Sequence, residues 1–197
     1  MLKAILYDAD GMVINKPKRF SEFYSEQFNV PLEKLLPFFQ KELDQIQAGK
    51  ADLKEKLQPY LADWNWHGSI DELLDYWFKV ENYTDQRLVE SIEMLRQKGI
   101  KCYLTTNQEK YRTHYLKNVM GMDKIFDEIL SSSRLGVLKP EQEYWEKVLS
   151  EIKVNKNEVL VWDDEQETVD SAKKLGFNAE FYINFEDYKK KMAAYGL

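Results

Sequence analysis

The sequence contains little cysteine, glycine or proline and has no long apolar segment. Its single cysteine, Cys102, cannot form an internal disulfide, so nothing points to an oxidising compartment. Only 8 glycines and 5 prolines occur among 197 residues, which excludes a linker-like or low-complexity chain. The apolar run at residues 4–7 is too short for a signal peptide, and no stretch of about 18 apolar residues exists for a membrane helix. We therefore expect a cytoplasmic protein without a membrane partner.

An excess of positive charge is also missing. The chain has 28 Lys and Arg against 34 Asp and Glu, a formal net charge of −6. A nucleic-acid-binding domain normally presents a basic face, so we expect no nucleic-acid partner. Apolar residues make up 44% of the chain and aromatic residues 14%, which is enough for a folded core of one or two domains. The composition does not indicate an oligomeric state.

Short apolar runs alternate with amphipathic helical patterns at the start of the chain and after residue 84. Strands are expected at residues 4–7, 100–105, 129–131, 159–162 and 179–183. Helices are expected at residues 85–98, 109–120, 141–152 and 165–175, the second of them capped by Asn107. Because alternating strands and helices form parallel β-α units, we expect a doubly wound, Rossmann-like α/β core from residues 1–14 and 85–197.

Residues 15–84 show only helical patterns, which predicts an all-helical lid inserted after the first strand. The patterns cover residues 21–28, 32–47, 52–62 and 70–82. Pro37 is expected to break the second helix, and Ser69 with Glu72 forms a capping-box pattern for the last. Trp64 and Trp66 lie in a loop of this segment, where packing is the simpler interpretation and stacking on a ligand the alternative.

Two carboxylates one residue apart follow the first expected strand, in Asp8-Ala9-Asp10-Gly11. The carboxyl ends of the strands form the ligand-binding edge of an open α/β sheet, and a glycine turn lets the second acid fold back toward the first. Nearby carboxylates repel each other unless a cation lies between them or one takes a proton. The pair therefore indicates a Mg²⁺ site or a nucleophile beside a general acid, with a plain turn as the alternative.

Polar residues also follow the next expected strands. Thr106 and Asn107 stand where a strand leads into a helix, a position that suits a phosphate oxygen or, more simply, a helix cap. Lys139, before Pro140, stands in a stiffened loop where its ammonium group is able to neutralise a phosphoryl group; an exposed lysine without function is the alternative.

Two adjacent acids, Asp163 and Asp164, end the fourth expected strand. Adjacent carboxylates are costly without a cation, and hard oxygen donors of this kind suit Mg²⁺. One metal ligand beside one helix cap is the plainer interpretation of the pair.

The ordered set Asp-x-Asp-Gly, Thr-Asn, Lys-Pro and Asp-Asp, each at a strand end, resembles the haloacid dehalogenase (HAD) superfamily, and the helical insert resembles its C1-type cap. The resemblance implies that Asp8 is a nucleophile that forms an aspartyl-phosphate, and that Asp10 serves as general acid and base. It implies phosphate contacts from Thr106 and the Asn107 backbone. It further implies that Lys139 bridges Asp8 and the phosphoryl group.

The same resemblance implies Mg²⁺ ligands at Asp8, Asp164 and the backbone carbonyl of Asp10, with Asp163 helping through water or hydrogen bonds. Where family members often carry Asp or Asn four residues after the metal-binding acid, this chain has Thr168, a departure in the outer metal shell. Dehalogenases of the superfamily lack the second acid of the first motif, so Asp10 favours phosphoryl chemistry.

These features predict an enzyme, a Mg²⁺-dependent phosphatase that hydrolyses a small phosphorylated metabolite. A phosphomutase or phosphotransferase that uses the same nucleophile is the alternative, in which a second hydroxyl replaces water as the acceptor. Lys16, Lys18 and Arg19 follow the first motif. Arg19 is the candidate substrate-binding residue among them, and an exposed basic hinge is the alternative.

Overall fold

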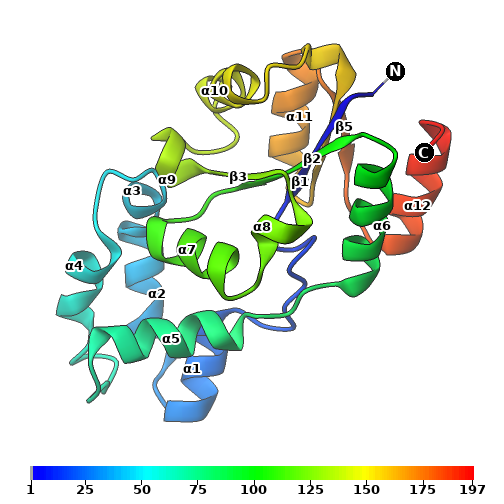
Figure 1. The fold of residues 1–197 in the computed structure, drawn as a ribbon. Coiled ribbons are helices and arrows are strands. Elements are labelled where there is room, and N and C mark those ends of the chain that lie inside the picture. Colours follow the sequence, from blue (N-terminus) through cyan, green and yellow to red (C-terminus); the bar gives the residue numbers. More distant parts are fainter. Residues whose placement is uncertain (1) are drawn as a thin grey trace.

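A five-stranded parallel sheet forms the centre of the protein in a computed structural model that describes residues 2–197 (Figure 1). Its strands are β1 (Ala4–Asp8), β2 (Lys101–Thr106), β3 (Glu128–Ser131), β4 (Val159–Asp163) and β5 (Asn178–Phe181). They lie in the order β3-β2-β1-β4-β5, and each neighbouring pair is parallel. The expected doubly wound α/β core is therefore confirmed.

Helices cover both faces of the sheet, as Figure 1 shows. They are α6 (Gln86–Gln97), α7 (Lys110–Asn118), α8 (Met122–Ile125), α9 (Ser132–Leu135), α10 (Gln142–Ile152), the short 3₁₀ helix η2 (Lys156–Glu158), α11 (Gln166–Lys174) and α12 (Phe185–Ala194). Alternate residues of β1 point to opposite faces: Ile5 packs in the cluster that includes α6 and α12, and Leu6 in the cluster of α10 and α11. This two-sided burial explains why the strands are apolar runs without alternation.

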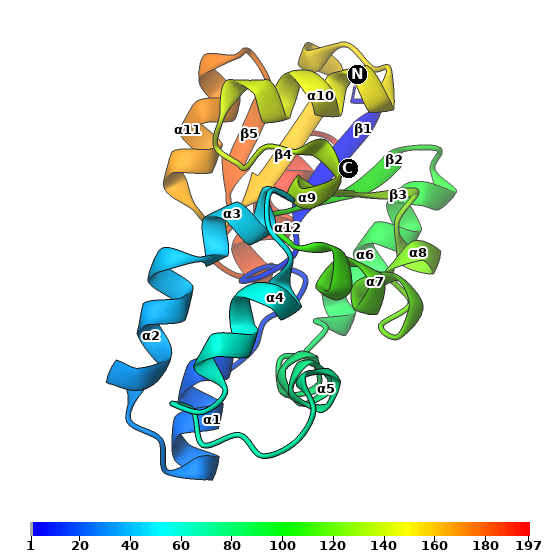
Figure 2. The same cartoon turned by 90° about the vertical axis from the view of Figure 1, so that its left-hand side faces the viewer.

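The chain between β1 and α6 forms a helical segment beyond the carboxyl ends of the strands (Figure 2). It contains α1 (Phe20–Phe28), α2 (Leu32–Lys41), α3 (Leu43–Gln47), α4 (Leu53–Leu57), the 3₁₀ helix η1 (Gln58–Tyr60) and α5 (Ile70–Val80). An aromatic-rich cluster of its own holds it together, with Phe20, Tyr24, Phe38 and Trp64 fully or almost fully buried. The packing interpretation of the Trp64 loop agrees with this burial.

The two chain crossings into the helical segment lie side by side. The Asn15 N–H donates to the carbonyl of Tyr83 at 2.9 Å, and the Asp85 N–H donates to the carbonyl of Val13 at 2.9 Å. Ile14 and Thr84 form a β-bridge between these bonds. The crossings therefore make a short two-stranded connection between the sheet and the helical segment, which we call the hinge.

Two local expectations were wrong. Pro37 lies inside α2, and the helix ends at Glu42 instead. The neighbours Leu35 and Phe38 are fully buried in the aromatic-rich cluster, and we attribute the survival of the helix through the proline to this packing. The cap of α7 is Glu109, whose carboxylate accepts the N–H groups of Tyr111 and Arg112, and not Asn107.

Helix α12 was not anticipated from the sequence. Asn184 caps its start by accepting the N–H of Asp187, and Tyr188 and Met192, four residues apart, are buried against the sheet. This cap and spacing are the signals that could have identified it. Among residues 2–197, no helix combines the length and apolar character that crossing a bilayer requires.

Candidate active site

The centre of the candidate site is an ammonium group held between two carboxylates from adjacent strands. Lys139 Nζ lies 2.5 Å from Asp8 Oδ1 at the end of β1 and 2.7 Å from Asp163 Oδ2 at the end of β4. It also donates to the carbonyl of Thr105 on β2, at 3.2 Å. All three charged residues are buried, with exposed fractions of 7% or less. Strand order therefore brings the first, third and fourth sequence motifs together.

Burial and the charges of neighbouring residues determine the pKa values of Lys139 and Asp8. Burial on its own would lower the pKa of Lys139, but the charges of Asp163 and Asp8 outweigh it and hold that pKa well above the usual value. Burial also raises the pKa of Asp8, and the nearby charges of Asp163 and Asp164 add to that effect, while Lys139 opposes it. The lysine is thus a permanent cation, and the carboxylates around it need further positive charge.

Asn107 fixes the loop that carries Lys139. Its side-chain Nδ2 donates to the Lys139 carbonyl at 3.0 Å, and its Oδ1 accepts the Lys139 N–H at 2.9 Å. These two bonds lock the backbone of the loop to the end of β2. The neighbouring Thr106 is buried at the same strand end and lines the pocket above Asp8.

Asp164 lies directly against the turn of the first motif. A Cβ atom placed on Gly11, which has φ +87°, would collide with the Asp164 carboxylate. The left-handed backbone favours glycine there, and a larger residue would also push the Asp164 carboxylate from its position. Burial, followed by the charges of Asp163 and Glu165, raises the pKa of Asp164 to about 6.

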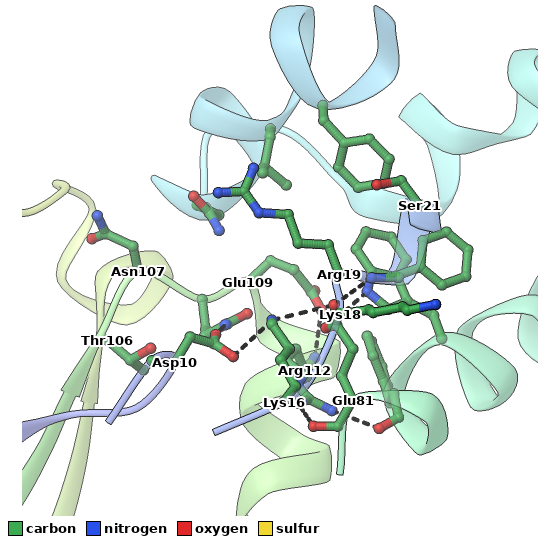
Figure 3. Close-up of a pocket in the computed structure, with 18 of the residues that line it drawn as sticks. Asp10, Lys16, Lys18, Arg19, Ser21, Glu81, Thr106, Asn107, Glu109 and Arg112 are labelled. Carbon is green, nitrogen blue, oxygen red and sulfur yellow. Dashed lines mark hydrogen bonds and ion pairs between the residues drawn. The ribbon is translucent and has the colours of Figure 1, made fainter. Parts of the chain in front are cut away.

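The Asp10 carboxylate points toward the hinge and the second strand end. It accepts a hydrogen bond from Lys16 Nζ at 2.9 Å and another from the side-chain amide of Gln108. Lys16 lies 3.2 Å from the Glu81 carboxylate as well, so one ammonium group links Asp10 to the end of the helical segment (Figure 3). Neither Gln108 nor Glu81 could be identified from sequence patterns, because these contacts depend on how the helices close over the sheet.

The donor set at this edge fits a hard divalent cation. Asp8 supplies a carboxylate from the first motif, Asp164 supplies one against the Gly11 turn, and the Asp10 carbonyl takes no part in the two bonds that shape that turn. Within residues 2–197, no three or more His, Cys, Asp or Glu side chains gather as a ready-made metal cluster. The fit therefore rests on two carboxylates and a backbone oxygen.

Asp163 has a different position from its neighbour. Its Oδ2 binds Lys139, and its Oδ1 accepts the Glu165 N–H at 2.9 Å. The side chain is buried beneath the pocket and does not line it.

A cavity of about 600 Å³ lies between the strand ends and the helical segment. The site residues expected from the sequence that line it are Asp8, Asp10, Arg19, Thr106, Asn107, Lys139 and Asp164. Figure 3 shows Arg19 extending into this pocket from the hinge. Its guanidinium group has no hydrogen bond or ion pair with any residue from 2 to 197, whereas Lys18 pairs with Glu26 at 2.5 Å.

Comparison with known proteins identifies a family and several relatives. Residues 5–180 match the family model described as haloacid dehalogenase-like hydrolase. A sesquiterpene phosphatase of Aspergillus oryzae is 30% identical over 92 residues, which are 47% of each chain. A phosphatase of Mycobacterium tuberculosis is 29% identical over 112 residues, 55% of this chain and 51% of that one. The chain thus spans about half the length of the curated relatives it matches.

Solved structures share the fold over almost the whole chain. A HAD-like family hydrolase from Porphyromonas gingivalis superposes with a TM-score of 0.81 at 17% identity, covering 98% of this chain and 97% of that one. A HAD family enzyme from Bacteroides thetaiotaomicron, solved in complex with magnesium and inorganic phosphate, has a TM-score of 0.79 at 19% identity, with 93% and 95% covered. At these identities the likeness concerns the fold.

Proposed function

This chain belongs to the haloacid dehalogenase-like hydrolase family, and from that premise we propose that it is a Mg²⁺-dependent phosphatase of small phosphorylated metabolites. The observation that carries the proposal is the buried Asp8–Lys139 pair that lines the pocket, with Asp164 against the turn that follows Asp8. A buried carboxylate aligned by a fixed cation is suited to nucleophilic attack on phosphorus. The named phosphatases among its relatives agree with this reaction class.

The reaction would proceed in two displacements. An Asp8 oxygen attacks phosphorus while the bond to the substrate oxygen breaks, and Asp10 gives its proton to the departing alcohol. Water then attacks the phosphorus of the aspartyl-phosphate, Asp10 takes the proton of that water, and Asp8 is released together with phosphate. The contacts of Asp10 with Lys16 and Gln108 hold its side chain at the pocket.

Charge in the pocket is arranged for a dianionic group. Lys139 neutralises part of the charge of Asp8 and Asp163, and Thr106 with the Asn107 backbone N–H is placed to bind phosphoryl oxygens. The role we propose for Asp163 is to hold Lys139. Arg19, which lacks a carboxylate partner among residues 2–197, would add positive charge from the hinge.

Mg²⁺ would be held by Asp8, Asp164 and the Asp10 carbonyl. When bound, it supplies the positive charge that lets a phosphate dianion approach these carboxylates. Thr168, which stands at the departure from the family pattern, is fully buried and lies 3.5 Å from the Glu165 carboxylate. Thr168 therefore contributes a hydroxyl and no carboxylate to the surroundings of the metal site.

We further propose that residues 15–84 act as the cap of this enzyme, with the core formed by residues 1–14 and 85–197. The paired crossings at Asn15–Tyr83 and Val13–Asp85 support a hinge at these limits. The cap residues on the cavity wall support a role in choosing the substrate.

Phosphate release tests the proposal directly. Purified protein is assayed with p-nitrophenyl phosphate and a panel of phosphorylated metabolites, with Mg²⁺ and with excess chelator. We expect release that requires Mg²⁺ and a hydroxylamine-sensitive phosphoryl adduct that is absent from Asp8→Asn. No Mg²⁺-dependent release from any compound would overturn the proposal, and an isomeric phosphate in place of free phosphate would assign a mutase.

A further inference from the structure

The cap wall of the pocket has the chemistry to choose a class of substrate. Resting on the phosphatase activity proposed above, we infer that this enzyme prefers phosphomonoesters of apolar alcohols, with an alkyl or aryl body, over phosphorylated sugars. The observations that carry this inference are the apolar residues of α2 and α3 on the cavity wall and the internal pairing of many polar groups around the cavity.

Helix α2 has two apolar faces with different surroundings. Leu35 and Phe38 are fully buried and belong to the aromatic-rich cluster of the cap. Leu36, Phe39 and Leu43 lie three and four residues apart along α2 and the start of α3, and all three line the cavity. Leu36 remains 37% exposed. Phe39 also packs against the aromatic-rich cluster, so Leu36 is the residue of this face that is left most open to a ligand.

The opposite wall of the pocket adds to this apolar surface. Leu53 of α4 and Trp77 and Phe78 of α5 also line the cavity. Apolar residues thus approach the space from four cap helices, while the reactive acids lie at the strand ends. An organic group that leaves water on binding beside these helices would meet carbon there, which favours hydrocarbon over hydroxyl-rich surfaces.

Polar side chains around the pocket are mostly bonded to one another or to the backbone. The Glu81 carboxylate accepts the N–H of Phe20 at 2.8 Å and the indole N–H of Trp77 at 3.2 Å, besides its contact with Lys16. Arg112 donates to the carbonyls of Phe78 at 2.9 Å and Glu81 at 3.3 Å.

The side-chain amides of Gln108 and Asn107, which are groups that a sugar hydroxyl could bind, are also paired within the protein. The Gln108 amide donates to Asp10, and both the nitrogen and the oxygen of the Asn107 amide are bonded to the Lys139 backbone. A sugar with several hydroxyl groups would therefore lose bonds to water and find few free partners here. Exceptions on the cavity wall include Arg19 and Gln47, whose side chains form no hydrogen bond with any residue from 2 to 197, and the charge of Arg19 suits the phosphoryl group.

The apolar residues of α2 and α3 on the cavity wall do not serve as a surface on which the cap could close further onto the core. The cap already contacts the core on that side, because Ser132 Oγ donates to the Gln47 carbonyl at 2.7 Å. A Cβ atom on the adjacent Gly49 would come within 2.5 Å of the Ser133 carbonyl oxygen. With α3 seated on α9 in this way, the cavity between α2 and the strand ends is left for a ligand.

The test compares kcat/KM for n-hexyl phosphate and phenyl phosphate with that for glucose 6-phosphate and ribose 5-phosphate, all with Mg²⁺. We expect the apolar esters to be favoured by about 10-fold or more, the size of discrimination typical of an apolar pocket. Equal or reversed preference, with Mg²⁺-dependent release intact, would overturn this inference alone. Absence of release from every ester would overturn the phosphatase proposal and this inference with it.

A matched pair of variants locates the preference on the cap. Leu36→Asn places an amide on the cavity wall, and Leu32→Asn places it one turn earlier on α2, at a residue that is 36% exposed and does not line the cavity. We expect Leu36→Asn to lower the ratio of hexyl phosphate to glucose 6-phosphate turnover several-fold and Leu32→Asn to leave it unchanged. The same ratio in both variants would show that this face does not select the substrate.

Discussion

Lys139 Nζ lies 2.5 Å from Asp8 Oδ1, although the two residues are 131 positions apart in the sequence. The ammonium group is shared with Asp163, and its loop is tied to β2 through the Asn107 side chain. Three strand ends therefore depend on one lysine for both charge balance and geometry. A cation held in this way costs less reorganisation when negative charge develops on a bound phosphoryl group.

Removal of this lysine should destabilise the protein strongly. Lys139→Ala leaves Asp8 and Asp163 buried without their positive partner, and such uncompensated burial typically costs about 3–5 kcal/mol. Urea unfolding measures the free energy difference. Lys101→Ala serves as control, because Lys101 pairs with Asp127 at the exposed end of β2 and should cost far less. Similar losses in the two variants would contradict the buried role of Lys139.

Replacement of the proposed nucleophile should separate activity from stability. Asp8→Asn keeps the shape of the side chain, and Lys139 retains Asp163 as a partner. We expect kcat to fall by about 10³-fold or more, because no carboxylate remains to attack phosphorus. The free energy of unfolding should be unchanged or higher, since one of several crowded carboxylates has lost its charge. Substantial residual turnover would remove Asp8 from the nucleophile role.

Magnesium should raise the melting temperature of the protein through Asp8 and Asp164. A ligand present at 100 times its Kd stabilises the folded state by about 2.7 kcal/mol. Thermal unfolding with and without Mg²⁺ measures this shift, which we expect Asp164→Asn to lose. Asp127→Asn alters a carboxylate far along the sequence that pairs with Lys101, so it should keep the shift. A shift that survives in Asp164→Asn would place the cation elsewhere.

Much of the candidate site follows from topology that can be inferred from sequence. Asp8, Thr106 and Asp164 each follow an apolar run, and parallel strands necessarily present their carboxyl ends at one edge. Their meeting in one pocket therefore needed no knowledge of side-chain packing. The order of the motifs carried the family resemblance, and the matching family model shows that family.

Contacts that depend on the exact position of the cap on the core could not be predicted from the sequence. Lys16 joins Asp10 to Glu81 only because the two hinge segments lie side by side, and no local pattern encodes that distance. Asn107 looked like a helix cap, yet its amide bonds to the backbone of Lys139, 32 residues away. Pro37 looked like a helix break, yet tertiary packing overrode it.

A side chain at Gly49 should weaken the contact between the cap and α9 of the core. Both Gly49 and Gly121 have φ +69°, so alanine at either position carries the left-handed backbone cost of about 1–2 kcal/mol. Only at Gly49 would the new Cβ also press on the Ser133 carbonyl, whereas the space around Gly121 is open. We therefore expect the larger loss of unfolding free energy in Gly49→Ala, together with faster amide hydrogen exchange around residues 47–52. Equal losses and unchanged exchange would show that this contact is loose.

A second contact between cap and core should make stability depend on acid pH. Asp52 of the cap lies 2.6 Å from Lys110 Nζ and accepts the hydroxyl of Tyr111 at 2.9 Å, both on α7. Burial acts to raise the pKa of Asp52, but these bonds and the N–H groups of Glu55 and Lys54 outweigh it and lower the pKa to about 2.

The sign of the pH effect follows from the direction of that shift. An unfolded aspartate has a pKa of about 3.9, so the folded state binds the proton less tightly than the unfolded state. The ionised Asp52 therefore stabilises the fold above about pH 4, and this contribution is lost as the pH falls through about 2. We expect urea unfolding to show a stability gap between the native protein and Asp52→Asn that is full at neutral pH and shrinks between about pH 4 and pH 2. Tyr111→Phe removes one of the bonds and should retain part of the pH dependence. A gap of constant size across this range would mean that the charge of Asp52 does not hold the cap to the core.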